Sequence, residues 1–320
     1  MGQAYVATQV AVDSGDEHQM KISLISRDNG AGLSTDMALL EDIFVSAGHE
    51  VVRVDWTARS MDQCDVGIFL ELLQPKLLKH MTYAIGIFNM EWFMIQWRRY
   101  LNNMNQLWAK GQEAHDVFNQ LGLGKKSHLT GFASRDFYRP GVVRKDQCLH
   151  LKGHSDLKNT PAVLEAWRRN PDLPHLIVVS NNDVPDMPSN ASLLRHVPTD
   201  KLIHLMNESY VHLCTSRSEG WGHYITEGLS TGAMVITTNA SPMKEHMSSE
   251  WGMLVEPSAK HRRGMVHEYD VDPDSIAESV FRAMSLTQAD RNRRSALARG
   301  HVAWRNQQFK NIALKLLGEL

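Results

Sequence analysis

The order of apolar and polar positions predicts an alternation of strands and helices along the chain. A largely apolar run at 20–26 precedes a turn rich in Gly and Asn, then apolar residues at helical spacing up to Phe44, then a second run at 50–55. Strand, turn, helix and strand make a βαβ unit, and such a unit requires parallel strands. Further strands are expected at 64–70, 83–88, 106–109 and 128–131.

A second alternation begins after the turn at 139–146, which combines Pro, Gly and charged residues and is expected to separate two domains. Its expected strands are 147–152, 176–180, 211–215 and 233–238. Its expected helices are 160–169, 200–207, 223–231, 273–285 and 289–317. The pattern predicts an α/β protein of two doubly wound, Rossmann-like domains that face each other across a cleft. The expected divisions are a flexible arm at 1–19, an N-terminal domain at 20–145, a C-terminal domain at 146–300 and a last helix at 301–320.

Composition and charge narrow the class of protein. The chain has 320 residues, 42% hydrophobic and 22% charged, which excludes a disordered or fibrous protein. Its three cysteines lie far apart, so neither a disulfide framework nor a structural zinc site is expected. The first nineteen residues hold three acids and no Lys or Arg, unlike a signal peptide, and no apolar run is long enough for a membrane span. These features predict a cytoplasmic protein.

The first turn between strand and helix carries two glycines, Gly30 and Gly32, and the second strand ends at Asp55. A dinucleotide-binding fingerprint has a third glycine, and Thr35 occupies that position. The two glycines therefore indicate only a sharp bend or a close backbone approach to a ligand. An NAD-dependent oxidoreductase is an alternative that rests on Gly30, Gly32 and Asp55.

The most informative segment is 216–238. Glu219 to Gly222 follows an expected buried strand, and the helix from His223 turns free N–H groups toward that loop. Such a helix start binds anions and suits a diphosphate. Glu227 lies eight residues after Glu219. Because carboxylates would repel a diphosphate, both are expected to accept hydrogen bonds from sugar and ribose hydroxyls.

Two motifs resemble the retaining GT-B glycosyltransferases of family 4, also called group 1. Their signature is a pair of glutamates separated by seven residues with a Gly-containing segment between, which Glu219 and Glu227 match. The stretch 152–167 resembles the start of their donor domain, where an Arg and a Lys bind the diphosphate. Lys158 matches the lysine, whereas His154 stands at the usual arginine position. The compact size also resembles the viral and phage members, whose location would be the host cytoplasm.

The resemblance implies a GT-B fold whose last helix crosses back to an acceptor-side N-terminal domain. It implies transfer of a sugar from a nucleotide-diphosphate sugar with retention of configuration, and no essential metal or cofactor. The donor is expected to be a UDP-sugar, with a GDP-sugar as the alternative. In the family the first glutamate contacts the transferred sugar and the second holds the ribose. The expected catalytic residues are Glu219, Lys158 and Glu91, and the nucleotide-sugar-binding residues are Gly30, Gly32, His154, Lys158, Gly220, Trp221, Gly222, His223 and Glu227.

The sequence leaves two classes of acceptor open. Residues 88–92 end a strand that faces the expected cleft, and 91–145 holds nine Lys or Arg against four acids, interleaved with aromatic residues. The acceptor is either a glycan or small molecule, or a hydroxymethylated base in phage DNA held by phosphate and stacking contacts. The expected acceptor residues are Asn89, Trp92, Arg98 and Arg99. A non-catalytic sugar-nucleotide-binding accessory protein is a further alternative.

Overall fold

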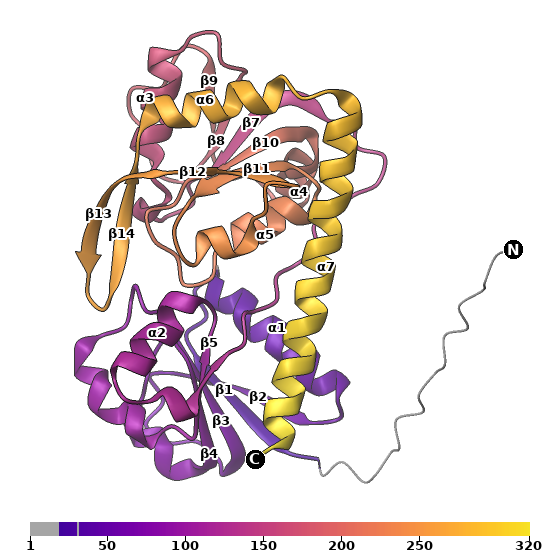
Figure 1. The fold of residues 1–320 in the computed structure, drawn as a ribbon. Coiled ribbons are helices and arrows are strands. Elements are labelled where there is room, and N and C mark those ends of the chain that lie inside the picture. Colours follow the sequence, from indigo (N-terminus) through magenta and orange to yellow (C-terminus); the bar gives the residue numbers. More distant parts are fainter. Residues whose placement is uncertain (1–18, 31) are drawn as a thin grey trace, which may run out of the picture.

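A computed structural model describes residues 19–30 and 32–320. The expected flexible arm at 1–19 therefore lies outside the described residues, apart from Gln19. The described chain forms two α/β domains, each built on a six-stranded sheet and flanked by helices (Figure 1). No helix among the residues that the structure describes is long and apolar enough to cross a membrane.

The N-terminal domain has the strand order β2-β1-β3-β4-β5-β6, with all neighbours parallel. Strands β1 and β3 are almost fully buried, which explains their near-continuous apolar sequences. The strands are β1 (Lys21–Ser26), β2 (Glu50–Asp55), β3 (Cys64–Leu70), β4 (Met81–Ile87), β5 (Gln106–Ala109) and β6 (Ser127–Leu129). The helices are α1 (Gly32–Ser46), α2 (Gln112–Gln120) and the 3₁₀ segments η1 (Pro75–His80), η2 (Ile95–Asn103) and η3 (Gly124–Lys126).

The C-terminal domain repeats this plan with the order β12-β11-β10-β7-β8-β9, again parallel. Its strands are β7 (Lys145–Leu151), β8 (Leu176–Val179), β9 (Ala191–Leu194), β10 (Ser209–Cys214), β11 (Met234–Thr238) and β12 (Gly252–Val255). Its helices are α3 (Thr160–Arg169), α4 (Thr199–Glu208), α5 (His223–Ser230), α6 (Pro273–Met284), η4 (Asp156–Lys158) and η5 (Met243–His246). The sequence pattern does not predict β9 and β12, because both are four-residue edge strands with partly exposed side chains.

Helix α7 (Gln288–Gly318) is 31 residues long and runs from the C-terminal domain down the side of the N-terminal domain (Figure 1). Phe309, Ala313 and Leu316 join the same apolar cluster as Ile22 of β1. The side chain of Gln106 also donates to the carbonyl of Leu316 at 3.0 Å. The last helix therefore crosses back, as a GT-B fold requires, and ties the two domains together.

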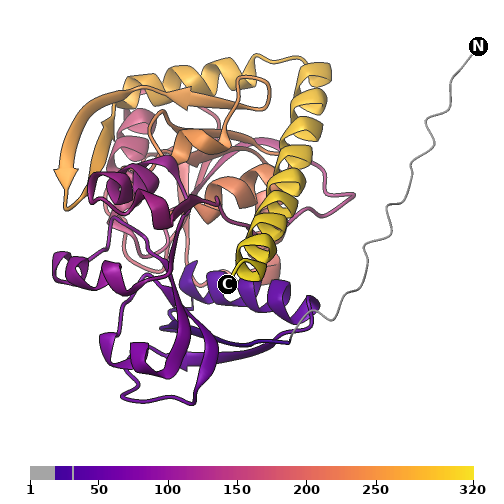
Figure 2. The ribbon, with the colours of Figure 1, turned by 60° about the horizontal axis from the view of Figure 1, so that its bottom comes forward.

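The antiparallel hairpin β13 (Pro257–Arg263) and β14 (Val266–Val271) is an element that the sequence analysis does not predict. It projects from the C-terminal domain beside the N-terminal one (Figures 1 and 2). Its turn uses Gly264 with φ +56°. Near that turn, Val266 is buried in an N-terminal-domain cluster with Phe93 and Trp97. The basic run at 260–263 gives β13 few apolar residues, so it is typical of a solvent-exposed loop.

Candidate functional site

The loop after β10 lies against the N-terminal domain. Gly222, with φ +93°, precedes helix α5, so the free N–H groups of that helix face the loop as expected. A Cβ atom on Gly220 would lie 2.3 Å from Oδ1 of Asn89. A side chain at position 220 would clash with Asn89, so only glycine allows this approach. Asn89 follows β4 in the other domain. The structure therefore places Gly220 and Asn89, both expected site residues, in contact across the cleft.

Glu219 and Lys158 form an ion pair in this loop. Nζ of Lys158 lies 2.5 Å from Oε1 of Glu219, and the hydroxyl of Ser216 donates to the same oxygen at 2.5 Å. The ammonium also lies 3.4 Å from the centre of the Tyr224 ring. Both side chains are largely buried: 14% of the Glu219 side-chain surface and 17% of the Lys158 side-chain surface are exposed. The fold thus joins two expected catalytic residues that are 61 positions apart.

The turn that carries Lys158 is fixed by its backbone. Asn159 adopts the left-handed conformation with φ +59°, and the carbonyl of Leu157 accepts the N–H of Arg217 at 2.7 Å. The hydroxyl of Ser155 caps the short η4 helix. His154 is exposed on the same loop. The turn after β7 and the loop after β10 therefore form one unit at the carboxyl edge of the sheet.

Glu227 lies on α5, half-buried. Burial raises the pKa of its carboxyl, while the positive charges of His223, Arg135 and Lys158 act in the opposite direction. Arg135 is exposed, and its charge lowers the pKa of Glu227. It is therefore a further residue near the expected donor site. From the sequence it is only one of the basic residues of 91–145.

The first glycine turn leaves room beside it. Gly30 has φ +62°, and a Cβ atom on either Gly30 or Gly32 would meet nothing within 4 Å. A ligand could therefore approach this backbone. Asp55, in contrast, accepts hydrogen bonds from the backbone N–H (2.8 Å) and the hydroxyl of Thr57, so its carboxylate is engaged in its own turn.

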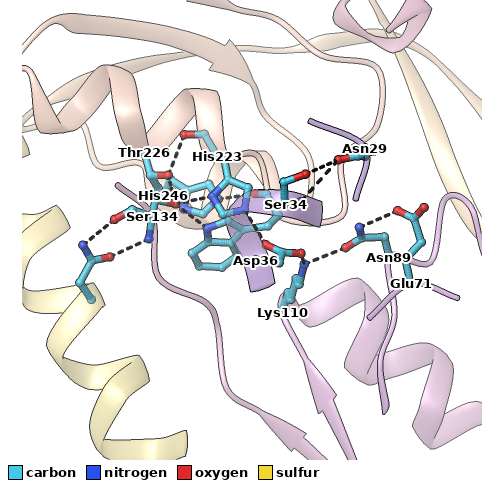
Figure 3. A network of polar contacts seen from close by, with 12 residues as sticks. Asn29, Ser34, Asp36, Glu71, Asn89, Lys110, Ser134, His223, Thr226 and His246 are labelled. Carbon is cyan, nitrogen blue, oxygen red and sulfur yellow. Dashed lines mark hydrogen bonds and ion pairs between the residues drawn. The ribbon is translucent and has the colours of Figure 1, made fainter. Parts of the chain in front are cut away.

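A buried polar network joins the two domains where they pack together (Figure 3). Nζ of Lys110 lies 2.5 Å from Asp36 and 3.0 Å from Oδ1 of Asn89. Nε2 of His223 lies 2.7 Å from the second oxygen of Asp36, across the domain boundary. Burial alone would raise the pKa of Asp36, but the charges and hydrogen bonds of Lys110 and His223 outweigh it and hold that pKa below its ordinary value. Sequence patterns gave no sign of Asp36 and Lys110, because only tertiary contacts bring them to the site.

Ser134, from the N-terminal domain, extends the network toward residues of the C-terminal domain. Its hydroxyl lies 3.0 Å from Nδ1 of His223 and accepts the indole N–H of Trp221 at 3.0 Å (Figure 3). Trp221 is 3% exposed and packs edge-on against His246. Its indole is therefore buried between Ser134 and His246.

Glu91 lies on the acceptor side of the cleft. Its Oε2 atom is enclosed and lacks a hydrogen-bond partner among the described residues. Burial, with the nearby carboxyls of Glu219 and Glu71, raises the pKa of Glu91 to about 8, while Lys110 acts in the opposite direction. A carboxyl with such a pKa can exchange a proton near neutral pH.

The remaining acceptor candidates lie on the surface of the same domain. Trp92 is 50% exposed, and Arg98 and Arg99 are exposed on η2. The two arginines border a cavity of about 540 Å³, which is also lined by Ile95, Gln96, Asn102, Leu121 and Leu123. Among the described residues, neither Arg98 nor Arg99 forms an ion pair or hydrogen bond with the cluster around Glu219. Within the described ranges, no group of three or more His, Cys, Asp or Glu side chains is arranged to hold a metal ion.

Comparison with known proteins gives a match to part of the chain. Residues 187–294 match the family model described as glycosyl transferases group 1. This stretch contains the loop after β10, helix α5 and both glutamates, Glu219 and Glu227. No curated protein sequence matches the chain.

Solved structures match almost the whole chain in fold. A glycosyltransferase from Rickettsia africae has a TM-score of 0.72 at 12% identity, over 94% of this chain and 98% of its own. Anabaena Alr3699/HepE, solved with UDP and glucose, has a TM-score of 0.69 at 13% identity, over 94% and 100%. A trehalose-6-phosphate synthase, studied for glycosyl transfer with retention, has 0.62 at 12%, over 81% and 74%. The expected α/β class and GT-B architecture are thereby confirmed.

Proposed function

We propose that this chain, whose residues 187–294 match the family model of group 1 glycosyltransferases and whose fold is shared with solved glycosyltransferases, transfers a sugar from a UDP-sugar to a hydroxyl acceptor with retention of configuration. The observation that carries this proposal is the Lys158–Glu219 pair, held at 2.5 Å beside the start of helix α5. Glu227 follows on that helix, and its carboxylate makes no hydrogen bond to the part of the chain that the structure describes. The cytoplasmic location stays a prediction.

The proposed mechanism assigns each group a separate part of the donor to bind. As the bond from sugar to diphosphate breaks, negative charge grows on the diphosphate, and Lys158 with the N–H groups of α5 stabilises it. The donor would then compete for Lys158, while Ser216 continues to hold Glu219 in place for the sugar hydroxyls. Glu227 would hold the ribose. Gly30 and Gly32, with open space beside them, would face the donor from the other domain.

UDP is proposed as the carrier because HepE, of the same fold, was solved with UDP and glucose. GDP is the alternative. Retention is supported by the resemblance of the glutamate pair and by the fold shared with trehalose-6-phosphate synthase. Measuring the anomeric configuration of the product by NMR would decide between retention and inversion.

A thermal-shift panel with UDP, GDP, CDP, ADP and TDP tests the donor site. A nucleotide at a hundred times its Kd should stabilise the fold by about 2.7 kcal/mol. We expect a selective shift with UDP that Glu227→Ala abolishes and that Glu278→Ala, an exposed glutamate on α6, retains. No shift with any diphosphate would overturn the proposal. Binding without donor hydrolysis or transfer would instead favour the accessory protein.

The acceptor stays within two proposed classes. A glycan or small molecule would need only the cleft around Asn89 and Glu91. A hydroxymethylated base in DNA is favoured by one specific observation, the exposure of Trp92, Arg98 and Arg99 on the same domain. Binding to DNA that weakens steeply with added salt would support the second class, and binding independent of salt would remove it.

A further inference from the structure

The β13–β14 hairpin contacts both sides of the cleft. It leaves the C-terminal domain after β12 and reaches the N-terminal domain, where His267 pairs with Glu113 of α2 at 2.8 Å. Figures 1 and 2 show it as an arm separate from both sheets. None of its residues is among the expected donor or acceptor residues.

One part of the hairpin holds the loop that carries Glu219. The N–H of Tyr269 donates to the carbonyl of Arg217 at 2.9 Å. The guanidinium of Arg217 pairs with Asp270 at 3.0 Å and with Glu268 at 3.0 Å. Arg217 lies two residues before Glu219, so the donor loop is fixed between the Lys158 turn and β14.

The tip of the hairpin holds the acceptor-side loop. Nε of Arg263 donates to the carbonyl of Glu91 at 3.1 Å, and its guanidinium lies 4.6 Å from the centre of the Trp92 ring. The same guanidinium pairs with Glu268. Glu268 therefore lies between Arg217 and Arg263, and a continuous chain of ion pairs connects the two loops.

Resting on the proposed function, we propose that this hairpin completes the acceptor site, and that Arg263 is the residue that positions Trp92 and the loop of Glu91 for the acceptor. An aromatic ring that is half-exposed, with one guanidinium fixed against it, offers its remaining surface to a ring of the acceptor. The acceptor class is thus a hydroxyl compound that presents a sugar or base ring to Trp92. Base stacking on an aromatic side chain contributes about 1–3 kcal/mol.

The chain offers a matched control one residue away. Arg262 is exposed on the same strand, and its Nε donates to the carbonyl of Gly264 within its own turn. Arg263→Ala and Arg262→Ala remove the same charge, but only the first breaks the contacts to Glu91 and Trp92. Two acceptor probes represent the two classes, methyl α-glucoside and an oligonucleotide containing 5-hydroxymethylcytosine.

We expect Arg263→Ala to raise the KM for the probe that the wild type uses at least tenfold, about 1.4 kcal/mol. The UDP-induced thermal shift and the hydrolysis of UDP-glucose, which needs no acceptor, should stay within twofold. Arg262→Ala should match the wild type. Trp92→Ala should also raise KM, and the Arg263→Ala/Trp92→Ala double variant should raise it by less than the product of the two single effects, because the two residues act together.

Hydrogen exchange provides a reading that needs no acceptor. Arg263→Ala should speed exchange of the amides at 89–95, and Arg262→Ala should not. An unchanged KM, unchanged exchange at 89–95, or equal effects of the two variants would overturn the inference. Failure of the proposed function is separate, because the wild type itself would then show no UDP shift.

Discussion

At the scale of single residues, the site is made of charged groups whose partners decide what each can do. Lys158 is held by Glu219 and by the ring of Tyr224, so its ammonium is already at the donor loop before a diphosphate arrives. Glu91 has the opposite environment, an enclosed carboxyl oxygen with other carboxyls nearby. Pre-positioned cations and proton-binding carboxyls are both features of active sites.

Glu219→Ala and Lys158→Ala should each lower kcat at least about a hundredfold, because a single electrostatic contact to a developing charge is worth about 2.7–4 kcal/mol. The double variant should lose less than the product of the two, since they act as one unit. Steady-state assays with UDP-glucose measure this. Lys201→Ala, an exposed residue of α4 without an ion pair among the described residues, is the control. Near-normal rates in either variant would contradict the assigned roles.

Glu91→Gln should change stability in a pH-dependent way. The pKa of Glu91 is raised from 4.5 to about 8, so between these values the folded protein binds a proton that the unfolded chain has released. Stability therefore falls as pH rises through this window, by up to about 1.4 kcal/mol for each pH unit, and stays lower above it. Glutamine removes the effect. The variant should have the higher Tm at pH 8 and a similar Tm near pH 4, whereas a difference that does not vary with pH would refute this.

At the scale of elements, the C-terminal domain could be predicted well because its signal is local. The loop after β10, the glycine before α5 and the glutamate pair occupy one short stretch, and the strand before them, β10, is buried throughout. The Asp36–Lys110–His223 network could not be predicted, because its residues lie 74 and 187 positions apart and only tertiary packing brings them together. The hairpin was missed for another reason. Its strand β14 is held by polar contacts, from Asp270 to Arg217 and from His267 to Glu113, which no hydrophobic pattern records.

Gly220→Ala tests how closely two elements approach, the loop after β10 and the end of β4. A Cβ there would lie 2.3 Å from Oδ1 and 2.5 Å from Cγ of Asn89, so the loops must separate. We expect UDP affinity to fall about tenfold or more, equivalent to about 1.4 kcal/mol. Gly300→Ala, where a Cβ meets nothing within 4 Å, should leave affinity unchanged and stabilise α7 slightly. Calorimetric titration with UDP measures both, and equal affinities would show that the approach is unimportant.

At the scale of the whole molecule, polar contacts bridge the domains at several places. Helix α7 spans both, the hairpin reaches from one to the other, and His223 pairs with Asp36 at the centre (Figures 1 and 3). Glu245 adds a further link, since its carboxylate accepts the N–H of Gln112 at the start of α2 at 3.0 Å. The two domains are therefore held in a defined arrangement, with the loop after β10 against the end of β4.

Lys110→Met tests the central link. Lys110 and Asp36 are each 2% exposed, and removing the cation leaves a buried carboxylate without its main partner, which costs about 3–5 kcal/mol. The Asp36→Asn/Lys110→Met double variant should recover part of this loss, because it no longer buries an unpaired charge. Arg195→Met is the control, since its pair with Asp183 is exposed and worth at most about 1 kcal/mol.

Acid should remove the same contribution in the wild type. The pKa of Asp36 lies below its ordinary value, so the stabilisation is present above that value and is lost as pH falls through the lower folded pKa. Urea unfolding at pH 7 and at pH 3 measures this, with the gap between wild type and the double variant narrowing at pH 3. An equal gap at both pH values, or a Lys110→Met cost as small as that of the surface pair, would mean that the buried Asp36–Lys110 pair adds little to the stability of the fold.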